Sequence, residues 1–301
     1  MEMLSSLWAT VDLRRDVLLI LTPLFVATLA VEWLAMRNRG VYRLSDSLAS
    51  IGLGSLYLVV DAVLVVALVL PIYHAVYGLT PWRLEMTPLM FGLLFLGVEF
   101  CYYVFHRASH RIRWFWAAHV VHHSSEQMNI TTSSRQSLFY GFSGNWLFYL
   151  PLVMLGFAPE WVLFMLSVDL AYQYFIHTQA IGRLPRPIEW LFNTPSHHRA
   201  HHGRNPQYID RNYGGVLIVF DRLFGTFVEE REKPEYGIPR QPKGFNPLWL
   251  NLHEWVDLVR DMIRPGPLWL RLKHLWAPPE WERPASGEAA QQPIGVRRTD
   301  A

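Results

Sequence analysis

The stretch that decides the fold is LASIGLGSLYLVVDAVLVVALVLPIYHAVYG, residues 48–78, in which Asp61 is the one carboxylate and neither Lys nor Arg occurs. A helix crosses the hydrocarbon core of a bilayer, about 30 Å thick, with about 20 apolar residues. The stretch therefore predicts a membrane-spanning helix. A buried helix of a large soluble protein is the alternative, and so long a run with a single charge counts against it.

Four other apolar runs have about the length of a membrane span. Each carries at most two ionised side chains, and they cover residues 17–36, 87–105, 138–158 and 160–177. The last two runs meet at Ala158-Pro159, which predicts a tight hairpin. We therefore expect an all-α integral membrane protein with four to five transmembrane helices.

The composition excludes several other classes of protein. Hydrophobic residues make up 51% of the 301 residues, too many for a disordered chain. The net charge of +2 offers no basic track for nucleic acid, so we expect no nucleic-acid partner. Cys101 is the single cysteine, which excludes a disulfide framework and a thiolate-bound iron–sulfur cluster.

Arginines in the short loops predict the orientation in the membrane. The first loop holds Arg37, Arg39 and Arg43, whereas the second holds Arg83, and this bias places the first loop in the cytoplasm. Counting crossings, the third and fifth spans then end on the cytoplasmic side, where a histidine-rich helical cap is expected. We expect no signal peptide, because acidic residues precede the first run and no small-residue cleavage site follows it.

Changes in composition divide the chain into four parts. Residues 1–86 are expected to hold N-terminal transmembrane helices, and residues 87–230 a catalytic region with further spans and the histidines. Residues 231–282 form a Pro- and Trp-rich C-terminal segment, and residues 283–301 a disordered tail. Within the third part, the apolar positions between Leu248 and Met262 have helical spacing. That helix either lies along the membrane surface or packs on the soluble part.

Ten of the 13 histidines fall between positions 106 and 202, in a repeated pattern. The pattern comprises an HxxxH pair, an HxxHH cluster, a lone histidine and a second HxxHH cluster that follows another histidine. Residues three or four apart share one face of a helix. The members, all predicted to bind metal, are His106, His110, His119, His122, His123, His177, His197, His198, His201 and His202.

Such a set of imidazoles points to metal chemistry. Neutral imidazole is a nitrogen donor suited to iron, zinc, copper or nickel. Eight to ten uncharged ligands would hold two divalent ions without cancelling their charge, so the ions would remain strong Lewis acids. His74, His253 and His274 stand outside the pattern, and we interpret them as ordinary packed residues.

Two carboxylates within the predicted spans share a helical face with histidines. Glu99 lies seven residues before His106, and Asp169 lies eight residues before His177. A metal-bound imidazole commonly donates its second N–H to a carboxylate, and an intramembrane carboxylate usually marks a functional site. We therefore expect Glu99 and Asp169 to support the metal ligands and catalysis. Asp61 is close to no histidine in the sequence and receives no role.

The histidine pattern resembles that of the fatty acid hydroxylase and sterol desaturase superfamily of membrane di-iron oxygenases, over about residues 90–228. Within it, the stretches FWAAHVVHHSSEQMNITTSSRQS (115–137) and NTPSHHRAHHGRNPQYIDRNYGGVLIVFDRLFGTF (193–227) look most like the alkylglycerol monooxygenases. The resemblance implies two iron ions held by the eight histidines of the HxxxH and HxxHH motifs, with His177 and His197 as further ligands or supporting groups. It also implies O₂-dependent hydroxylation of an unactivated C–H bond in a lipid, such as an ether lipid, a sterol or an acyl chain.

One position departs from the resemblance. The alkylglycerol monooxygenases use tetrahydrobiopterin, and their pattern has a glutamate directly after HxxxH, where this chain has Arg111. A cation in that place puts tetrahydrobiopterin in doubt. The expected partners are a lipid from the bilayer, O₂ and an electron donor that the sequence does not identify.

Three other functions fit part of the pattern. A desaturase would use the same site and the same hydrogen abstraction, and product masses would separate it from a hydroxylase. A non-enzymatic metal transporter or store should place its ligands at the bilayer midplane, whereas these histidines lie at the ends of spans. A bis-histidine haem protein would need two facing histidines deep within the spans.

Overall fold

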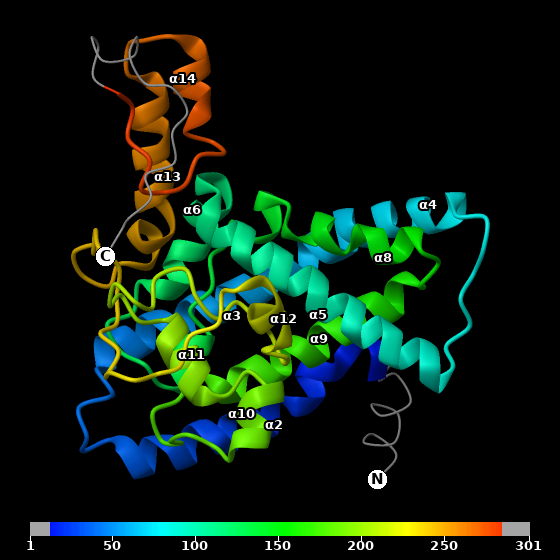
Figure 1. Cartoon of the computed structure of the whole chain (residues 1–301), viewed down its shortest axis with the longest axis horizontal. Coiled ribbons are helices and arrows are strands. Elements are labelled where there is room, and N and C mark those ends of the chain that lie inside the picture. The colour runs from blue at the N-terminus through cyan, green and yellow to red at the C-terminus, as the bar shows by residue number, and fades with distance from the viewer. Residues whose placement is uncertain (1–12, 285–301) are drawn as a thin grey trace.

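The computed structural model describes residues 13–284, with side chains from Val17 onward, and its regular structure is helical (Figure 1). In this range an isolated antiparallel bridge joins Phe192 to Leu217. The prediction of an all-α chain is therefore confirmed for the described residues. The helices are α2 (Leu13–Met36), α3 (Leu44–Leu64), the π-helix η1 (Val65–Val69), α4 (Leu70–Leu79), α5 (Pro88–Arg111), α6 (Arg113–His123), α7 (Ile130–Ser133), the 3₁₀-helices η2 (Gly141–Ser143) and η3 (Asn145–Tyr149), α8 (Leu150–Met154), α9 (Pro159–Ile176), α10 (Arg186–Leu191), α11 (Pro195–His201), α12 (Val219–Phe224), α13 (Pro247–Ile263) and α14 (Leu268–Lys273).

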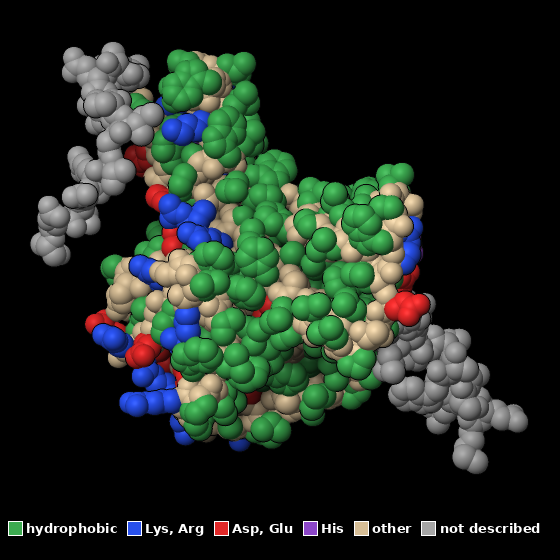
Figure 2. All heavy atoms as spheres, turned by 45° about the vertical axis from the view of Figure 1, so that its right-hand side comes forward, with side chains coloured by type: hydrophobic (Ala, Val, Ile, Leu, Met, Phe, Trp, Pro, Cys, Tyr) green, Lys and Arg blue, Asp and Glu red, His purple; other side chains and the backbone are tan. Residues whose placement is uncertain are grey.

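Three helical stretches in the described part are long and apolar enough to cross a membrane: Val17–Met36, Leu44–Leu79 and Pro88–Arg111. Their apolar side chains mostly face outward, since only 11%, 22% and 39% of an 18-residue apolar part of the three stretches, in chain order, is buried inside the protein. Figure 2 shows hydrophobic side chains spread over most of the visible bundle, with charged groups gathered mainly on one flank. An apolar outer surface of this extent is what contact with lipid requires.

The second stretch is continuous through α3, η1 and α4, and a π-turn interrupts its regular hydrogen bonding. Pro71 is the second residue after η1, within the first turn of α4. A proline lacks the N–H that an α-helix needs and its ring crowds the preceding turn. The wider π-turn at Val65–Val69 accommodates it, so the helix continues beyond the proline.

The structure corrects the fourth predicted span. Residues 138–158 are not one helix but a succession of turns, η2, η3 and the short α8. Gly144 has a left-handed backbone (φ +92°) that ends one 3₁₀-turn and begins the next. The predicted fifth span is the 18-residue helix α9, which packs on α2, α4 and α5.

The two ends of the bundle differ in what they hold. At one end the loop after α2 meets the histidine region, where the Asn129 side chain donates to the Val41 carbonyl and Ser125 donates to Asp46. At the opposite end the loop after α4 meets the α8–α9 turn, where Leu84 N–H donates to Gly156 O. The arginine-rich first loop and the histidines thus lie at the same end of the molecule.

The C-terminal segment forms a helical hairpin, α13 and α14, that projects from the histidine end (Figure 1). The buried Arg113 of α6 pairs with Glu254 at 2.8 Å and with Asp261 at 2.7 Å, both on α13. Of the two interpretations of residues 248–262, the structure thus favours packing on the rest of the protein. The predicted disordered tail lies, from residue 285, outside the described residues.

Candidate metal centre

Four elements bring the predicted histidines together in the interior. Helix α5 supplies two of them and α6 three, His177 follows α9 directly, and α11 with its C-terminal cap supplies the second HxxHH cluster. The ring nitrogens form two sets of buried groups, and within each set they lie within 4.8 Å of one another. The five-histidine group is His106, His110, His119, His123 and His201, and the four-histidine group is His122, His177, His198 and His202.

The Nε2 atoms in each group face one another. In the five-histidine group, His119 Nε2 lies 3.1 Å from His106 Nε2 and 3.0 Å from His123 Nε2. In the four-histidine group, His177 Nε2 lies 3.1 Å from His122 Nε2 and 2.8 Å from His198 Nε2. Two nitrogens that each bind one ion at about 2.1 Å, at about 90° to each other, are about 3 Å apart. The spacing fits ligand atoms around a shared ion.

The opposite ring nitrogens show that these Nε2 atoms carry lone pairs. His177 Nδ1 donates to the Gln173 carbonyl at 2.6 Å, and His122 Nδ1 donates to the Arg135 carbonyl at 3.2 Å. A carbonyl can only accept, so in the neutral rings both protons are on Nδ1 and both Nε2 atoms are bare. Two bare nitrogens at 3.1 Å repel each other unless a cation lies beside them.

Further buried nitrogens lack a protein partner. His110 Nε2 and His201 Nε2, both in the five-histidine group, have no hydrogen-bond partner among the described residues. A buried polar atom without a partner costs about 1–3 kcal/mol. A metal ion in the group would satisfy both, and the site residues therefore fit a metal.

Burial keeps these imidazoles neutral, as metal binding requires. Burial lowers the pKa of His201 to about 4, against the opposing effect of its hydrogen bond to the Arg211 carbonyl. Burial and the neighbouring His122 and His198 hold the pKa of His202 well below its ordinary value. At neutral pH these rings therefore present free lone pairs.

His197, predicted as a further ligand or supporting group, lies outside both groups. Its Nε2 lies 2.9 Å from Glu189 Oε2, and its Nδ1 lies 3.2 Å from the Phe192 carbonyl. On α11 it lies one position before His198, so its side chain leaves the helix about 100° away from that ligand face.

Glu99 and Asp169 are buried, but neither contacts an imidazole, contrary to prediction. Glu99 Oε2 accepts from the backbone N–H groups of Val216 and Leu217, at 2.9 and 2.7 Å. Asp169 Oδ2 accepts from the Gln173 side chain at 2.6 Å, whereas Asp169 Oδ1 and Glu99 Oε1 have no hydrogen-bond partner among the described residues. Glu99 thus holds the loop after α11, and that loop in turn orients His106 through the Tyr213 carbonyl. The partners of the ligand rings are chiefly backbone carbonyls.

Close packing explains a glycine in that loop. A Cβ at Gly215 would collide with Asp169 Oδ1 and the Tyr102 ring. The same loop carries the Tyr213 carbonyl, which accepts from His106 Nδ1 at 2.9 Å. A side chain at position 215 would therefore displace a group that orients a ligand of the five-histidine group.

Two supporting side chains escaped the sequence analysis. Tyr140 lies in the broken fourth segment, and its hydroxyl is 2.8 Å from His119 Nδ1. Arg135, whose carbonyl orients His122, is fully buried and pairs with Asp46 at 3.1 Å. Neither belongs to a histidine motif, although a buried arginine paired with an acid at the start of α3 ties the centre to the membrane helices.

A cavity of about 770 Å³ leads from the histidines between the apolar helices. His119, His122 and His177 line one part of it, and residues of α2, α3, α4, α5, α9 and the broken segment 138–158 line much of the rest. Its α3–α4 wall runs from Ile51 to Tyr73, about 33 Å of helix. The volume is in the range of ligand sites, and the walls suit a long apolar chain.

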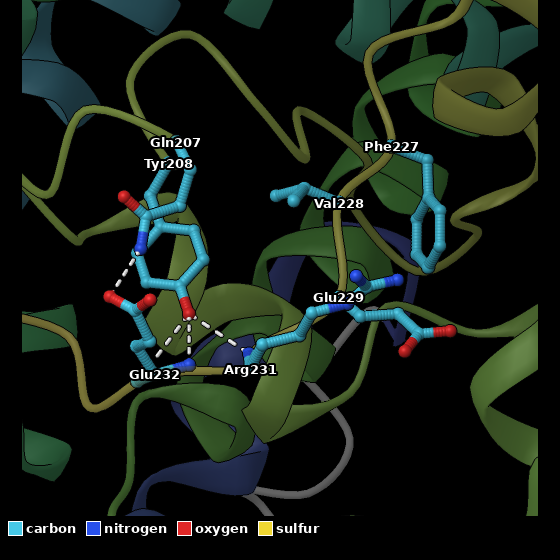
Figure 3. Close-up of a pocket in the computed structure, with 7 residues that line it drawn as sticks. All are labelled: Gln207, Tyr208, Phe227, Val228, Glu229, Arg231 and Glu232. Atoms are coloured by element: carbon cyan, nitrogen blue, oxygen red, sulfur yellow. Dashed lines mark hydrogen bonds between the residues drawn. The ribbon is translucent and has the colours of Figure 1, made fainter.

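A second hollow, of about 610 Å³, lies away from the histidines (Figure 3). Its central Tyr208 hydroxyl accepts from the backbone N–H groups of Arg231 and Glu232 and donates to the Glu232 carbonyl. Gln207 donates to Glu232 Oε2 at 2.8 Å. These polar groups are satisfied within the protein, and no histidine lines the hollow, so it has no part in the metal centre.

The part of the chain that holds the histidines is similar to known proteins. Residues 91–226 match the family model described as fatty acid hydroxylase. The chain is 39% identical over 247 residues to alkylglycerol monooxygenase of Homo sapiens, covering 79% of this chain and 54% of that protein. It is 46% identical over 176 residues to alkylglycerol monooxygenase of Xenopus tropicalis, covering 58% of this chain and 38% of that protein.

A more distant relative is ornithine lipid hydroxylase OlsE of Rhizobium tropici, 28% identical over 155 residues, which cover 52% of this chain and 46% of that protein. The chain thus spans about half the length, or less, of these relatives. No solved structure matches it significantly. The matches confirm the resemblance to the fatty acid hydroxylase superfamily.

Proposed function

We propose, on the premise that residues 91–226 match the fatty acid hydroxylase family model, that the chain is a membrane di-iron monooxygenase that hydroxylates a lipid. The observation that carries the proposal is the pair of buried histidine groups, three of whose members line a cavity between apolar helices. A metal store would need the ligands but not the cavity. Family and relatives support a lipid monooxygenase in general, and the metal identity and substrate are the proposed part.

The five- and four-histidine groups would each hold one iron ion. When bound, the ions supply the activation of O₂ that an unactivated C–H bond requires. The overall reaction takes lipid, O₂, two electrons and two protons to hydroxylated lipid and water. The chain itself contributes neutral ligands, carbonyls that orient them, and an apolar cavity that positions the substrate and excludes water.

An ether lipid is the substrate class that we propose. The human and Xenopus relatives are named alkylglycerol monooxygenase, and the cavity has room for a long alkyl chain. Because α2 and α3 form its walls and expose apolar side chains to the outside, a lipid would enter sideways from the bilayer. We also propose that the histidine end faces the cytoplasm, since Arg37, Arg39 and Arg43 lie at that end.

The electron donor is not tied to tetrahydrobiopterin in this proposal. Arg111, in the place of the glutamate that the resemblance connects with pterin use, pairs with Asp210 and with Glu280. Its charge is thus balanced by two acids of this chain. An assay should therefore offer tetrahydrobiopterin and a one-electron protein donor in parallel.

The test is oxygen incorporation. Purified, iron-loaded protein would be incubated with 1-O-hexadecylglycerol, ¹⁸O₂ and each donor, and the products analysed by mass spectrometry. We expect one ¹⁸O atom at the carbon beside the ether oxygen. The hemiacetal formed there collapses to glycerol and a long-chain aldehyde, so the aldehyde should be reduced to the alcohol at once, before its oxygen exchanges with water. Loss of two hydrogens without oxygen would instead identify a desaturase. Failure to oxidise any ether lipid, sterol or acyl lipid, with two irons bound, would contradict the proposal.

A further inference from the structure

Asp61, left without a role by the sequence, lies on the wall of the cavity. It belongs to α3, inside the Leu44–Leu79 membrane stretch, and is partly buried. Among the described residues no basic side chain pairs with it, and Tyr57, one turn earlier on the same face of the helix, lines the cavity beside it. A carboxylate at this depth is costly and usually serves a function.

The wall opposite Asp61 is formed by the broken fourth segment. A Cβ on Gly141 would collide with Leu64 and lie 3.5 Å from Asp61 Oδ1, so the backbone of this segment approaches the carboxylate closely. Asn145, a few residues on, also lines the cavity. Irregular backbone at membrane depth is tolerated where it is buried in protein or lines a cavity. The cavity therefore has a polar patch, formed by Tyr57, Asp61, Tyr140 and Asn145, within largely apolar walls.

The polar patch is connected to the metal centre. The Tyr57 ring lies 6.4 Å from the Tyr140 ring, centre to centre, and the Tyr140 hydroxyl contacts His119 Nδ1 at 2.8 Å. A polar group held by Asp61 would thus lie only two side chains away from a ligand of the five-histidine group. The apolar remainder of the cavity, toward Val69 and Tyr73, would take the chain attached to it.

We propose that Asp61 and Tyr57 bind the free hydroxyl groups of the lipid substrate and thereby set which carbon reaches the metal centre. The carboxylate can accept hydrogen bonds from two neighbouring hydroxyls, as in a glycerol head, and the uncharged partners around it suit a neutral lipid. This inference rests on the proposed function, whose substrate class it narrows to lipids with hydroxyls near the reacting carbon. It explains why a membrane helix carries a carboxylate without a cationic partner.

The test compares binding of two lipids that differ only in their hydroxyls. Purified full-length protein in detergent, without O₂, would be titrated with radiolabelled 1-O-hexadecylglycerol and with its 2,3-di-O-methyl ether. We expect the free diol to bind roughly 10- to 100-fold more tightly, as hydrogen bonds to a charged group would give. Asp61→Asn should remove most of this preference by weakening the diol alone, and Tyr57→Phe should reduce it less.

Controls separate recognition from folding. Glu160→Gln alters an exposed carboxylate that pairs with His74 at 3.1 Å outside the cavity, and should leave both affinities unchanged. Equal affinity of the wild type for the two lipids, or equal weakening of both by Asp61→Asn, would overturn the inference, as would tighter binding of hexadecylamine than of the diol. If Asp61→Asn does not fold, Tyr57→Phe decides by the same criterion.

Failure of the inference about Asp61 can be distinguished from failure of the proposed function. Oxidation of both lipids at similar rates, with no difference in binding, would refute the role of Asp61 and leave the monooxygenase standing. A binding preference that depends on Asp61, without any oxidation by the iron-loaded protein, would support the polar patch and refute the monooxygenase.

Discussion

The five-histidine group and the four-histidine group share one interior but differ in ligand number and surroundings. An ion with six coordination positions would keep about one open in the former and about two in the latter. Two members of the four-histidine group, His122 and His177, line the cavity, against His119 alone from the other. If both groups held iron as proposed, the ion of the four-histidine group would have more room for O₂ and substrate, and the ion of the five-histidine group would support it.

The two groups also differ in what orients them. The five-histidine group depends on the loop after α11, through the carbonyls of Arg211 and Tyr213, and on the Tyr140 hydroxyl. The four-histidine group depends on the carbonyls of Arg135 and Gln173. Substitutions can therefore disturb one group while leaving the other formed.

The largest effect is expected from removing one ligand of each group. His122→Ala and His201→Ala should each lower turnover by more than about 100-fold and reduce bound metal, because a ligand matters at least as much as the groups that orient it. Elemental mass spectrometry and the lipid assay would measure both, with circular dichroism as the check on folding. Either variant with full metal and full activity would refute the ligand assignment.

The second largest effect is expected from low pH, which should release metal from the histidine groups. Folded His201 has a pKa of about 4, below the ordinary 6.5, so the unfolded chain takes up its proton more readily. The contribution of neutral His201 to the free energy of unfolding is intact above about pH 6.5. It is lost as the pH falls toward 4, and the loss is about 2 kcal/mol at pH 5. We expect metal content after equilibration to fall steeply below pH 6.5. Full retention at pH 4.5 would contradict neutral imidazole ligands.

A smaller and one-sided effect is expected from Tyr140→Phe. Loss of the hydroxyl beside His119 should lower activity or metal affinity about 10-fold, within the range for groups that orient a ligand. Any loss of metal should be confined to the ion of the five-histidine group, to which His119 belongs. Tyr149→Phe, a tyrosine of the same cavity outside both groups, is the matched control, and an equal loss there would remove the special role of Tyr140.

The smallest effects on the metal should come from histidines outside both groups. His197→Ala breaks the contact with Glu189 and should cost about 1–2 kcal/mol of stability while both ions remain. His253→Ala should leave turnover within about twofold. Metal analysis and thermal unfolding of both variants would measure these effects. Loss of one ion from His197→Ala would show that His197 is a ligand.

The spacing of the histidines in the sequence predicted which of them lie close together, because residues three or four apart on a helix share a face. Nine of the ten lie in the two groups, and His197 fails because a neighbour of a ligand points elsewhere. Length and hydropathy likewise indicated the three long apolar helices.

Other features depend on contacts far apart in the chain. Residues 138–158 are as apolar as a span, yet they fold into short turns, with a left-handed backbone at Gly144 and close packing of Gly141 on Leu64 of α3. Glu99 shares a helical face with His106, but its Oε2 accepts from backbone N–H groups more than 100 residues away. Periodicity cannot report such partners, which is also why Tyr140 and Arg135 were missed.

The central claim is a pair of iron ions, and the most direct test is the iron content of the purified full chain after anaerobic, iron-supplemented expression. We predict about two irons per chain, with each of His122→Ala and His201→Ala reducing that number. No tightly bound metal in the wild type, or a single haem, would contradict the claim.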